Sequence, residues 1–291
     1  MALKWLERQD IDEIKWEECI NDSLFPSLFG RYWFWDAMTD GNWQAVIEDH
    51  YQAVLPVYKR RKWGLPYVTM PFLCQKTDIF SAKDYHIDFT KYFKLISKSI
   101  VKLEIKTSHH GTDFGHFVEK TNQILTLSSI NRDVSSGYNR NTKRNITKSV
   151  DAGVHISFES NPEEVYSFIK KHDVTGLIDS YGNQVKRLIS ESLAKGRGFG
   201  VKAKLNGNVI SMAFFIRDTK RLYFLLCTSN DTGKKVSSMY QLIDHVIQSN
   251  ASTDLIFDFT GSSMENIARR NRGFGATEET YYHVKWNIFG I

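Results

Sequence analysis

The chain has 291 residues, of which 42% are hydrophobic and 24% charged. It can therefore build the cores of about two ordinary domains and does not have the composition of a disordered protein. Its formal net charge of +5 suits phosphate-bearing ligands but falls short of a nucleic-acid-binding signature. Three widely spaced cysteines, Cys19, Cys74 and Cys227, argue against a disulfide framework or a zinc knuckle. The charged N-terminus lacks an apolar signal region, and no apolar run approaches the about 18 residues of a transmembrane helix, so we expect a cytoplasmic protein.

The first half of the chain predicts a mixed α/β domain with the order β-α-α-β-β-β-α-β. Aromatic residues make up 13% of the whole chain, and we expect most of them to pack in cores. Asp10, followed by Glu13, predicts the N-cap of the first helix. Apolar periodicity and turn residues predict helices at 10–19, 29–38 and 85–97, and strands at 3–7, 43–48, 52–58, 67–70, 100–105 and 124–127.

A change in composition follows near residue 130. Residues 132–148 are rich in Arg, Lys and Asn, and their second half predicts a helix over 141–151 that ends at Gly153. We therefore predict an N-terminal domain over 1–130 and a C-terminal domain over 131–291.

The second half predicts the order β-α-α-β-β-β-α-β-α-β. Asn161 followed by Pro162 is typical of a helix start, with Asn as the N-cap. Asn206-Gly207 predicts a tight hairpin. The expected strands are 154–158, 199–205, 209–217, 222–227, 255–259 and 280–287, and the later helices are 185–194, 236–248 and 262–272, with a loop at 228–235. The two halves share an element order without a repeated sequence, so we infer a repeat of topology alone.

Three segments of the second half stand out. They are the basic run Arg140–Ile146 with Lys148, the strand–loop–helix over 222–247, and Phe257-Asp258-Phe259-Thr260-Gly261-Ser262 followed by Phe274-Gly275. Together they resemble the GCN5-related N-acetyltransferase (GNAT) superfamily, in the branch of the Fem-type peptidoglycan aminoacyltransferases and their acyl-CoA-using relatives. The resemblance implies two GNAT-like modules in tandem, each a mixed α/β sheet.

The resemblance implies a donor site at the strand–loop–helix. In a GNAT module the donor's pantetheine arm pairs with an exposed strand edge, and its pyrophosphate sits on backbone N–H groups at the start of the next helix, which favour an anion. A solvated loop followed by a helix cap remains the alternative, because this loop has one glycine where GNAT loops have two. The donor-binding residues so implied are Leu226, Cys227, Thr228, Gly233, Lys234, Lys235, Ser237, Ser238 and Asn266.

The sequence leaves more than one interpretation for the catalytic groups. Asp258 is either a carboxylate on the acceptor side or a structural one that bonds neighbouring backbone N–H groups. Many GNAT enzymes use a tyrosine to protonate the leaving thiolate, but the matching position here is Asn271 or nearby. Tyr281 and Tyr282 on the last strand are the candidate substitutes.

Three other features have two interpretations each. His109, His110 and His116 with Asp113 fit no metal-ligand spacing, so we expect a solvated loop and no metal site. Cys227 on the expected donor strand could be a nucleophile, but no neighbouring residue in the sequence suggests a paired base, so we expect a buried core thiol. The run Lys59–Gly64 joins two strands, and its four cations and indole suit phosphate, a lipid headgroup or RNA, with a solvated hairpin tip as the alternative.

We therefore predict an N-acyltransferase that moves an acyl group from a thioester to a small-molecule or peptide amine. Acyl-CoA would be the co-substrate, with no tightly bound cofactor. One alternative is an aminoacyl-tRNA-dependent Fem-type enzyme, against which the absence of a long heptad segment argues. Another is a non-catalytic binding protein that has kept the fold.

Overall fold

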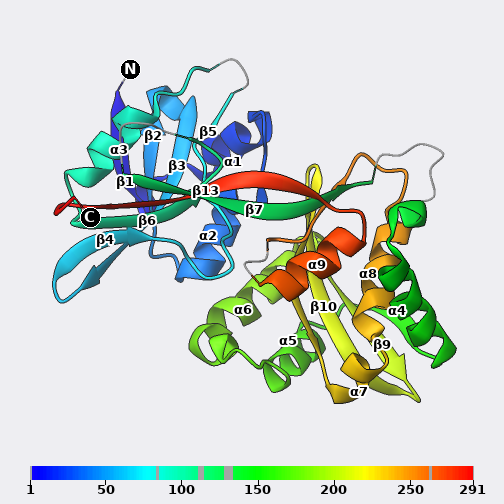
Figure 1. Cartoon of the computed structure of the whole chain (residues 1–291). Coiled ribbons are helices and arrows are strands. Elements are labelled where there is room, and N and C mark those ends of the chain that lie inside the picture. The colour runs from blue at the N-terminus through cyan, green and yellow to red at the C-terminus, as the bar shows by residue number, and fades with distance from the viewer. Residues whose placement is uncertain (1, 83–84, 111–114, 128–133, 262–263, 291) are drawn as a thin grey trace. The chain divides into compact units, whose positions relative to one another are not determined.

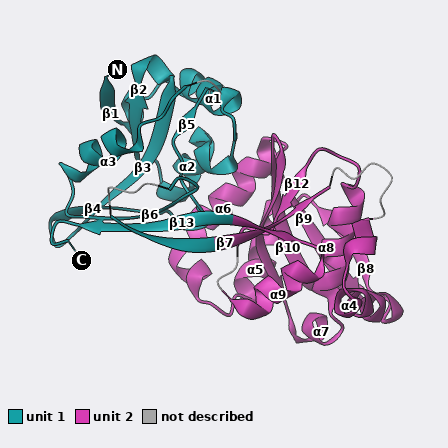
Figure 2. Ribbon diagram, turned by 45° about the horizontal axis from the view of Figure 1, so that its top comes forward, with its two compact units in different colours: residues 1–120, 280–291 teal, residues 121–279 magenta. Residues whose placement is uncertain are grey.

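The computed structural model describes residues 2–82, 85–110, 115–127, 134–261 and 264–290. The chain divides into two compact units (Figure 2). Unit 1 comprises Met1–Lys120 and Thr280–Ile291, and unit 2 comprises Thr121–Glu279. The predicted domain boundary between residues 130 and 131 lies outside the described residues. In the structure the division comes earlier, between Lys120 and Thr121, and the last segment of the chain belongs to unit 1.

Unit 1 is built on a sheet in the order β1-β2-β3-β4-β6-β13. Its pairs are antiparallel except for β4 and β6, which are parallel. The elements are β1 (Leu3–Glu7), α1 (Glu13–Asp22), α2 (Tyr32–Thr39), β2 (Gln44–Glu48), β3 (Ala53–Lys62), β4 (Leu65–Thr69), β5 (Phe80–Ser81), α3 (Phe89–Ser97), β6 (Lys102–Thr107), the start of β7 (His116–Thr126) and most of β13 (Thr277–Asn287).

Unit 2 has a sheet in the order β8-β9-β10-β11-β12-β7, with α4 and α8 over one face and α5 and α6 over the other (Figure 1). Its elements are α4 (Arg140–Asp151), β8 (His155–Glu159), α5 (Pro162–Lys171), α6 (Leu177–Ala194), β9 (Gly198–Leu205), β10 (Asn208–Asp218), β11 (Arg221–Ser229), α7 (Asp231–Lys235), α8 (Ser238–Ser249), β12 (Ile256–Asp258) and α9 (Glu265–Gly273).

The two sheets have the same strand directions. As in unit 1, the fourth and fifth strands of unit 2, β11 and β12, are parallel, and the other neighbours are antiparallel. The sixth strand of each sheet comes from elsewhere in the chain. β7 follows the strands of unit 1 in sequence but pairs with β12, and β13 follows unit 2 but pairs with β6. The predicted repeat of topology is therefore confirmed, with an exchange of the last strand.

Local sequence signals account for several of these elements. The Asn161 side chain accepts a hydrogen bond from the Glu163 N–H at 3.0 Å, and Pro162 opens α5, as predicted. Asn206 and Gly207 both have positive φ and join β9 to β10. The aromatic residues pack as expected, since Trp16, Trp35 and Trp43 are fully buried in unit 1.

Other predictions are corrected. Asp10 ends a short 3-10 turn, and Asp12 caps α1 instead by accepting from the Lys15 N–H at 3.2 Å. The helix predicted over 185–194 begins earlier, at Leu177. The loop predicted over 228–235 is replaced by the end of β11 and the short helix α7. Ser262, the first residue of the helix predicted over 262–272, lies outside the described residues.

Candidate functional site

The parallel strands β11 and β12 pair only over their first three residues, from Arg221–Ile256 to Tyr223–Asp258. At that point the register between β10 and β11 shifts, which leaves Leu225 as an extra residue in β11. Such a bulge bends a strand and increases its twist. Beyond it, the Thr260 hydroxyl donates to the Phe224 carbonyl at 2.7 Å, in place of a ladder bond. β11 then continues to Ser229 past the end of its pairing with β12.

The diverging end of β11 carries three of the predicted donor-binding residues. Leu226 is buried, whereas Cys227 is exposed, so the expectation that Cys227 is a core thiol is wrong. Cys227 follows the bulge, and one-residue shifts of this kind change which face a side chain takes. The Thr228 hydroxyl donates to the carbonyl of His172 at 2.8 Å, which ties the end of α5 to this strand.

The connection from β11 to α8 is more compact than a loop. Gly233 is buried in α7, and a Cβ added there would overlap the carbonyl oxygen of Ile210 and lie 2.7 Å from Ser211 Oγ. The close approach that requires this glycine is therefore to β10. Ser238 is also buried, and its hydroxyl lies 2.6 Å from Ser211 Oγ. Gly233 and the Ser238 side chain thus serve internal packing.

Two exposed residues of the same connection are basic. Lys234 and Lys235 are exposed on α7, and Lys234 pairs with the exposed Asp231 at 3.3 Å. Ser237 precedes α8 with a φ of 61° and makes no side-chain cap, so α8 begins without the usual capping bond. Its hydroxyl donates instead to Asn145 Oδ1 of α4 at 2.9 Å. This bond places α4 beside the start of α8.

Helix α4 presents four cations to solvent. Thr142 and Ser149 face inward and are buried. The exposed cations fall at helical spacings of three and four residues, so they share the outer face. They are Arg140, Lys143, Arg144 and Lys148.

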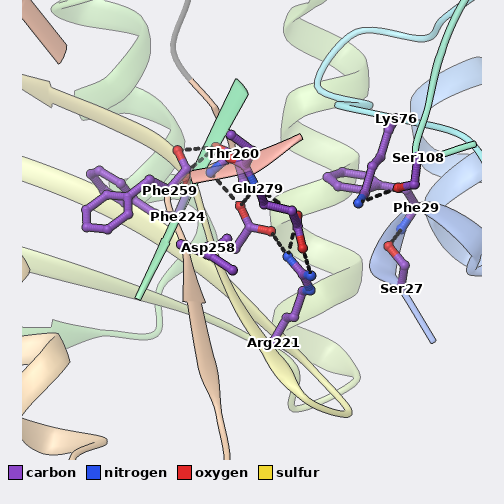
Figure 3. Close-up of polar contacts among 12 residues, drawn as sticks. Ser27, Phe29, Lys76, Ser108, Arg221, Phe224, Asp258, Phe259, Thr260 and Glu279 are labelled. Atoms are coloured by element: carbon purple, nitrogen blue, oxygen red, sulfur yellow. Dashed lines mark hydrogen bonds and ion pairs between the residues drawn. The ribbon is translucent and has the colours of Figure 1, made fainter. Parts of the chain in front are cut away.

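Asp258 lies fully buried at the paired end of β12, where three donors hold its carboxylate (Figure 3). Arg221 Nη1 donates to one oxygen at 2.7 Å, and Asn122 Nδ2 and the Thr260 N–H donate to the other at 3.0 and 2.8 Å. Glu279 pairs with the same guanidinium. Burial alone lowers the pKa of Arg221, but its bonds to Glu279 and the charge of Asp258 outweigh burial and raise it above the ordinary value. Both carboxylate oxygens of Asp258 are thus engaged within the fold.

The remaining predicted residues belong to other elements. Tyr281 and Tyr282 belong to unit 1, on opposite faces of β13, and the Tyr282 ring packs 4.8 Å from that of His110. Asn266 is exposed on α9. The structure does not test their predicted roles, which stay predictions.

Sequence reasoning did not single out His172. Its ring lies 4.6 Å from that of Phe168, and its carbonyl accepts from Thr228. Burial lowers the pKa of His172 below its usual range, and the positive charge of Lys171 acts in the same direction. The backbone of His172 thus lies beside β11, and its side chain is a neutral imidazole that can accept a proton. A lone histidine ahead of a helix break has no sequence signature, so only the contact with Thr228 reveals it.

The expectation of a solvated loop at His109 also needs correction. His109 is partly buried, and its ring packs 3.9 Å from that of Phe89. Burial lowers the pKa of His109 despite the opposing charge of Asp78. Asp113 lies outside the described residues. Across residues 2–82, 85–110, 115–127, 134–261 and 264–290, no three His, Cys, Asp or Glu side chains group as metal ligands would.

Solved structures superpose on nearly the whole chain. FemX covers 98% of this chain and 97% of its own length, with a TM-score of 0.66 and 10% identity. The chain has a tandem GNAT-like fold of the FemX type. The C-terminal domain of a putative lysylphosphatidylglycerol synthetase from Agrobacterium fabrum aligns over 95% of this chain and 93% of its own (TM-score 0.61, 9% identity). A tandem GNAT protein from the clavulanic acid biosynthesis pathway covers 98% of both chains (TM-score 0.57, 9% identity). No protein-family model and no curated protein matches.

Within this GNAT-like fold, Asn271 of α9 takes part in an internal network. Its side-chain oxygen accepts from Arg270 Nε at 3.2 Å, and its amide donates to Gln123 Oε1 at 3.4 Å. Arg270 lies over the Phe224 ring at 5.7 Å, next to the point where β11 diverges. The helix therefore places a guanidinium, rather than a phenol, near the diverging strand.

In unit 1, the place that corresponds to the divergence of β11 from β12 is occupied by another segment of the chain. The segment after β4 runs along β6, where the Thr77 N–H donates to the Lys106 carbonyl at 2.7 Å. The Asp78 carboxylate accepts from the Ser108 N–H at 2.6 Å and from the Thr107 hydroxyl at 2.8 Å. These bonds occupy the end of β6 beyond its pairing with β4. The candidate donor site is therefore the one in unit 2.

Proposed function

We propose that the chain is an N-acyltransferase whose unit 2 binds an acyl-CoA donor and passes the acyl group to an amine. The divergence of β11 from β12 carries this proposal. A strand that outlasts its neighbour offers backbone N–H and C=O groups to an extended, amide-bearing ligand. The pantetheine arm of CoA is such a ligand, and the residues from Leu225 to Ser229 would receive it.

Charges near the start of α8 support a phosphate-bearing donor. The first N–H groups of a helix attract anions, and α8 begins without a side-chain cap. Lys234 and Lys235 lie on the helix just before it. Arg144 and Lys148 flank Asn145, which bonds Ser237 at that same junction. We infer that these side chains contact the donor's phosphates.

The acceptor would approach along the connection between α5 and α6. Thr228 ties this connection to β11, and the apolar side chains of Val174 in the connection and of Leu177 and Tyr181 at the start of α6 are exposed. The amine nitrogen attacks the thioester carbonyl carbon, the carbon–sulfur bond breaks to release the CoA thiolate with the bonding electron pair, and the nitrogen gives up a proton. His172, neutral because burial lowers its pKa, would accept that proton.

Calorimetric titration of acetyl-CoA and longer acyl-CoAs tests the donor site. Replacing both lysines, Lys234→Glu with Lys235→Glu, should weaken binding about tenfold, because exposed charge pairs each contribute up to about 1 kcal/mol. The matched control reverses two exposed lysines elsewhere in unit 2, Lys195→Glu with Lys220→Glu, and should leave binding unchanged. Equal affinities for the wild type and the first variant would contradict the assignment.

A second candidate is an aminoacyl-tRNA donor. The four exposed cations of α4 favour it, because a basic helix face suits a polynucleotide backbone. FemX and a lysylphosphatidylglycerol synthetase are among the structures that this chain resembles. Retention of tRNA that falls steeply with salt, and that Lys143→Glu with Arg144→Glu abolishes, would favour this donor over CoA. No retention at low salt would eliminate it.

A further inference from the structure

The β3–β4 hairpin of unit 1 ends in a tryptophan that the fold exposes at a conformational cost. The strands pair up to Lys62–Leu65 and turn through Trp63 and Gly64, whose φ values are 53° and 79°. This type of two-residue turn favours Asn or Gly, and a bulky residue in the left-handed region is an outlier. Arg61 Nη1 donates to the Gly64 carbonyl at 3.0 Å and holds the turn. The Trp63 side chain is 89% exposed, so packing returns little of that cost.

Other exposed apolar side chains lie near this tip. The Val101 N–H donates to the Pro66 carbonyl at 2.8 Å, and the Ile288 N–H donates to the Val101 carbonyl at 3.1 Å. The end of β13 thus lies two strand spacings, about 10 Å, from the start of β4. Figure 1 shows the end of β13 beside β6 and β4. We call the following four residues the apolar edge: Trp63 (89% exposed), Leu65 (54%), Ile288 (53%) and Phe289 (80%).

Four consecutive cations stand directly behind the apolar edge. Lys59, Arg60, Arg61 and Lys62 precede the turn, and the Lys62 ammonium lies 4.8 Å from the centre of the Trp63 ring. At about 3.3 Å per residue, they extend from about 3 to 13 Å behind Trp63. At their base is a hollow of about 470 Å³ lined by Glu7, Asn42, Gln44, Lys59, Arg60 and Arg61.

We propose that the apolar edge docks on the surface of an anionic phospholipid bilayer, a property that acyl transfer does not require. Tryptophan prefers the boundary between headgroups and acyl chains. With Trp63 there, Lys62 and Arg61, about 3 and 7 Å behind it, lie within the headgroup layer, which is about 5–8 Å thick on each side, and Arg60 and Lys59 lie at its aqueous face. The hollow beside Arg60 and Arg61 then receives a lipid phosphate.

A bilayer accounts for the edge better than RNA does. A base could stack on Trp63, but it would leave Leu65, Ile288 and Phe289 in water. A bilayer covers all four apolar side chains and pairs the cations at once. In the described part of the chain, no helix has the length and apolar character needed to cross a bilayer, so this contact is with the surface.

Co-sedimentation of the full chain with vesicles tests the proposal. Vesicles of phosphatidylcholine with about a third phosphatidylglycerol should bind the protein, and pure phosphatidylcholine vesicles should bind it far less. Each cation near an anionic surface strengthens binding about fivefold, so Arg60→Gln with Arg61→Gln should weaken it about thirtyfold. Trp63→Asn keeps the turn conformation and should also weaken binding. Lys195→Gln with Lys220→Gln is the charge-matched control and should bind like the wild type.

Two results would overturn the proposal. One is equal sedimentation with the two kinds of vesicle, or none with either, at low salt. The other is binding to anionic vesicles that neither Trp63→Asn nor the double variant Arg60→Gln with Arg61→Gln weakens. The proposal is overturned in the same way if those variants lose RNA retention while vesicle binding stays unchanged. Melting curves matching the wild type establish that the variants are folded. A variant that loses vesicle binding but keeps the wild-type affinity for acyl-CoA separates this proposal from that of the donor site.

Discussion

Asp258→Asn tests whether the buried carboxylate at the end of β12 anchors the fold or performs chemistry. The substitution keeps the shape of the side chain but places an amide where Arg221 now donates at 2.7 Å. A lost charge-assisted bond costs about 1.5–3 kcal/mol, and two facing donors add to it. Glu279 still pairs with Arg221, so the cost stays below the about 3–5 kcal/mol of a fully orphaned charge. We expect the free energy of unfolding to fall by about 2–3 kcal/mol.

Urea denaturation can resolve this loss by unit. All seven tryptophans lie in unit 1, so tryptophan fluorescence follows that unit, whereas far-ultraviolet circular dichroism follows both. Asp258→Asn should shift the dichroism transition to lower urea. The matched control, Glu265→Gln, makes the same chemical change in an exposed pair with Arg272 and should stay within about 0.5 kcal/mol of the wild type. A variant as stable as the wild type that has lost acyl transfer would refute the anchoring role and make Asp258 a catalytic carboxylate.

The other predictions concern α7 and the proton acceptor. Gly233→Ala should destabilise the protein by about 1–3 kcal/mol, because the new methyl group meets the backbone of β10. Gly137→Ala, where nothing lies within 4 Å, should be neutral or slightly stabilising by thermal melting, and equal effects of the two changes would contradict the packing. For His172, the lowered pKa keeps the imidazole neutral at pH 7, so the wild-type rate should fall only as pH drops below about 6.5, the ordinary value. His172→Gln should lower kcat about 100-fold or more and remove that acidic limb, and a variant with the wild-type pH profile would exclude His172 as the base.

The sequence alone determined the features that depend on neighbouring residues. Asn161-Pro162 at the start of α5 and Asn206-Gly207 between β9 and β10 act through backbone groups a few positions away, so their patterns predict the structure directly. The order of strands and helices in the second half is likewise a property of local periodicity. Together with three short motifs, it was enough to predict the tandem GNAT-like fold that the structural comparisons show.

Tertiary structure decided whatever depends on residues distant in the sequence. The exchange of β7 and β13 pairs strands across more than a hundred positions, and no local signal specifies it. From the sequence alone, Gly233 is consistent with a phosphate-binding loop. In the structure it lies in a helix, where its close contact with β10 requires a glycine. Asp258 and Arg221 meet because β11 and β12 are parallel neighbours, and the His172 carbonyl meets β11 at Thr228. The burial of such groups and their hydrogen-bonding and ion-pair partners set their charge state and role, and both arise from long-range packing.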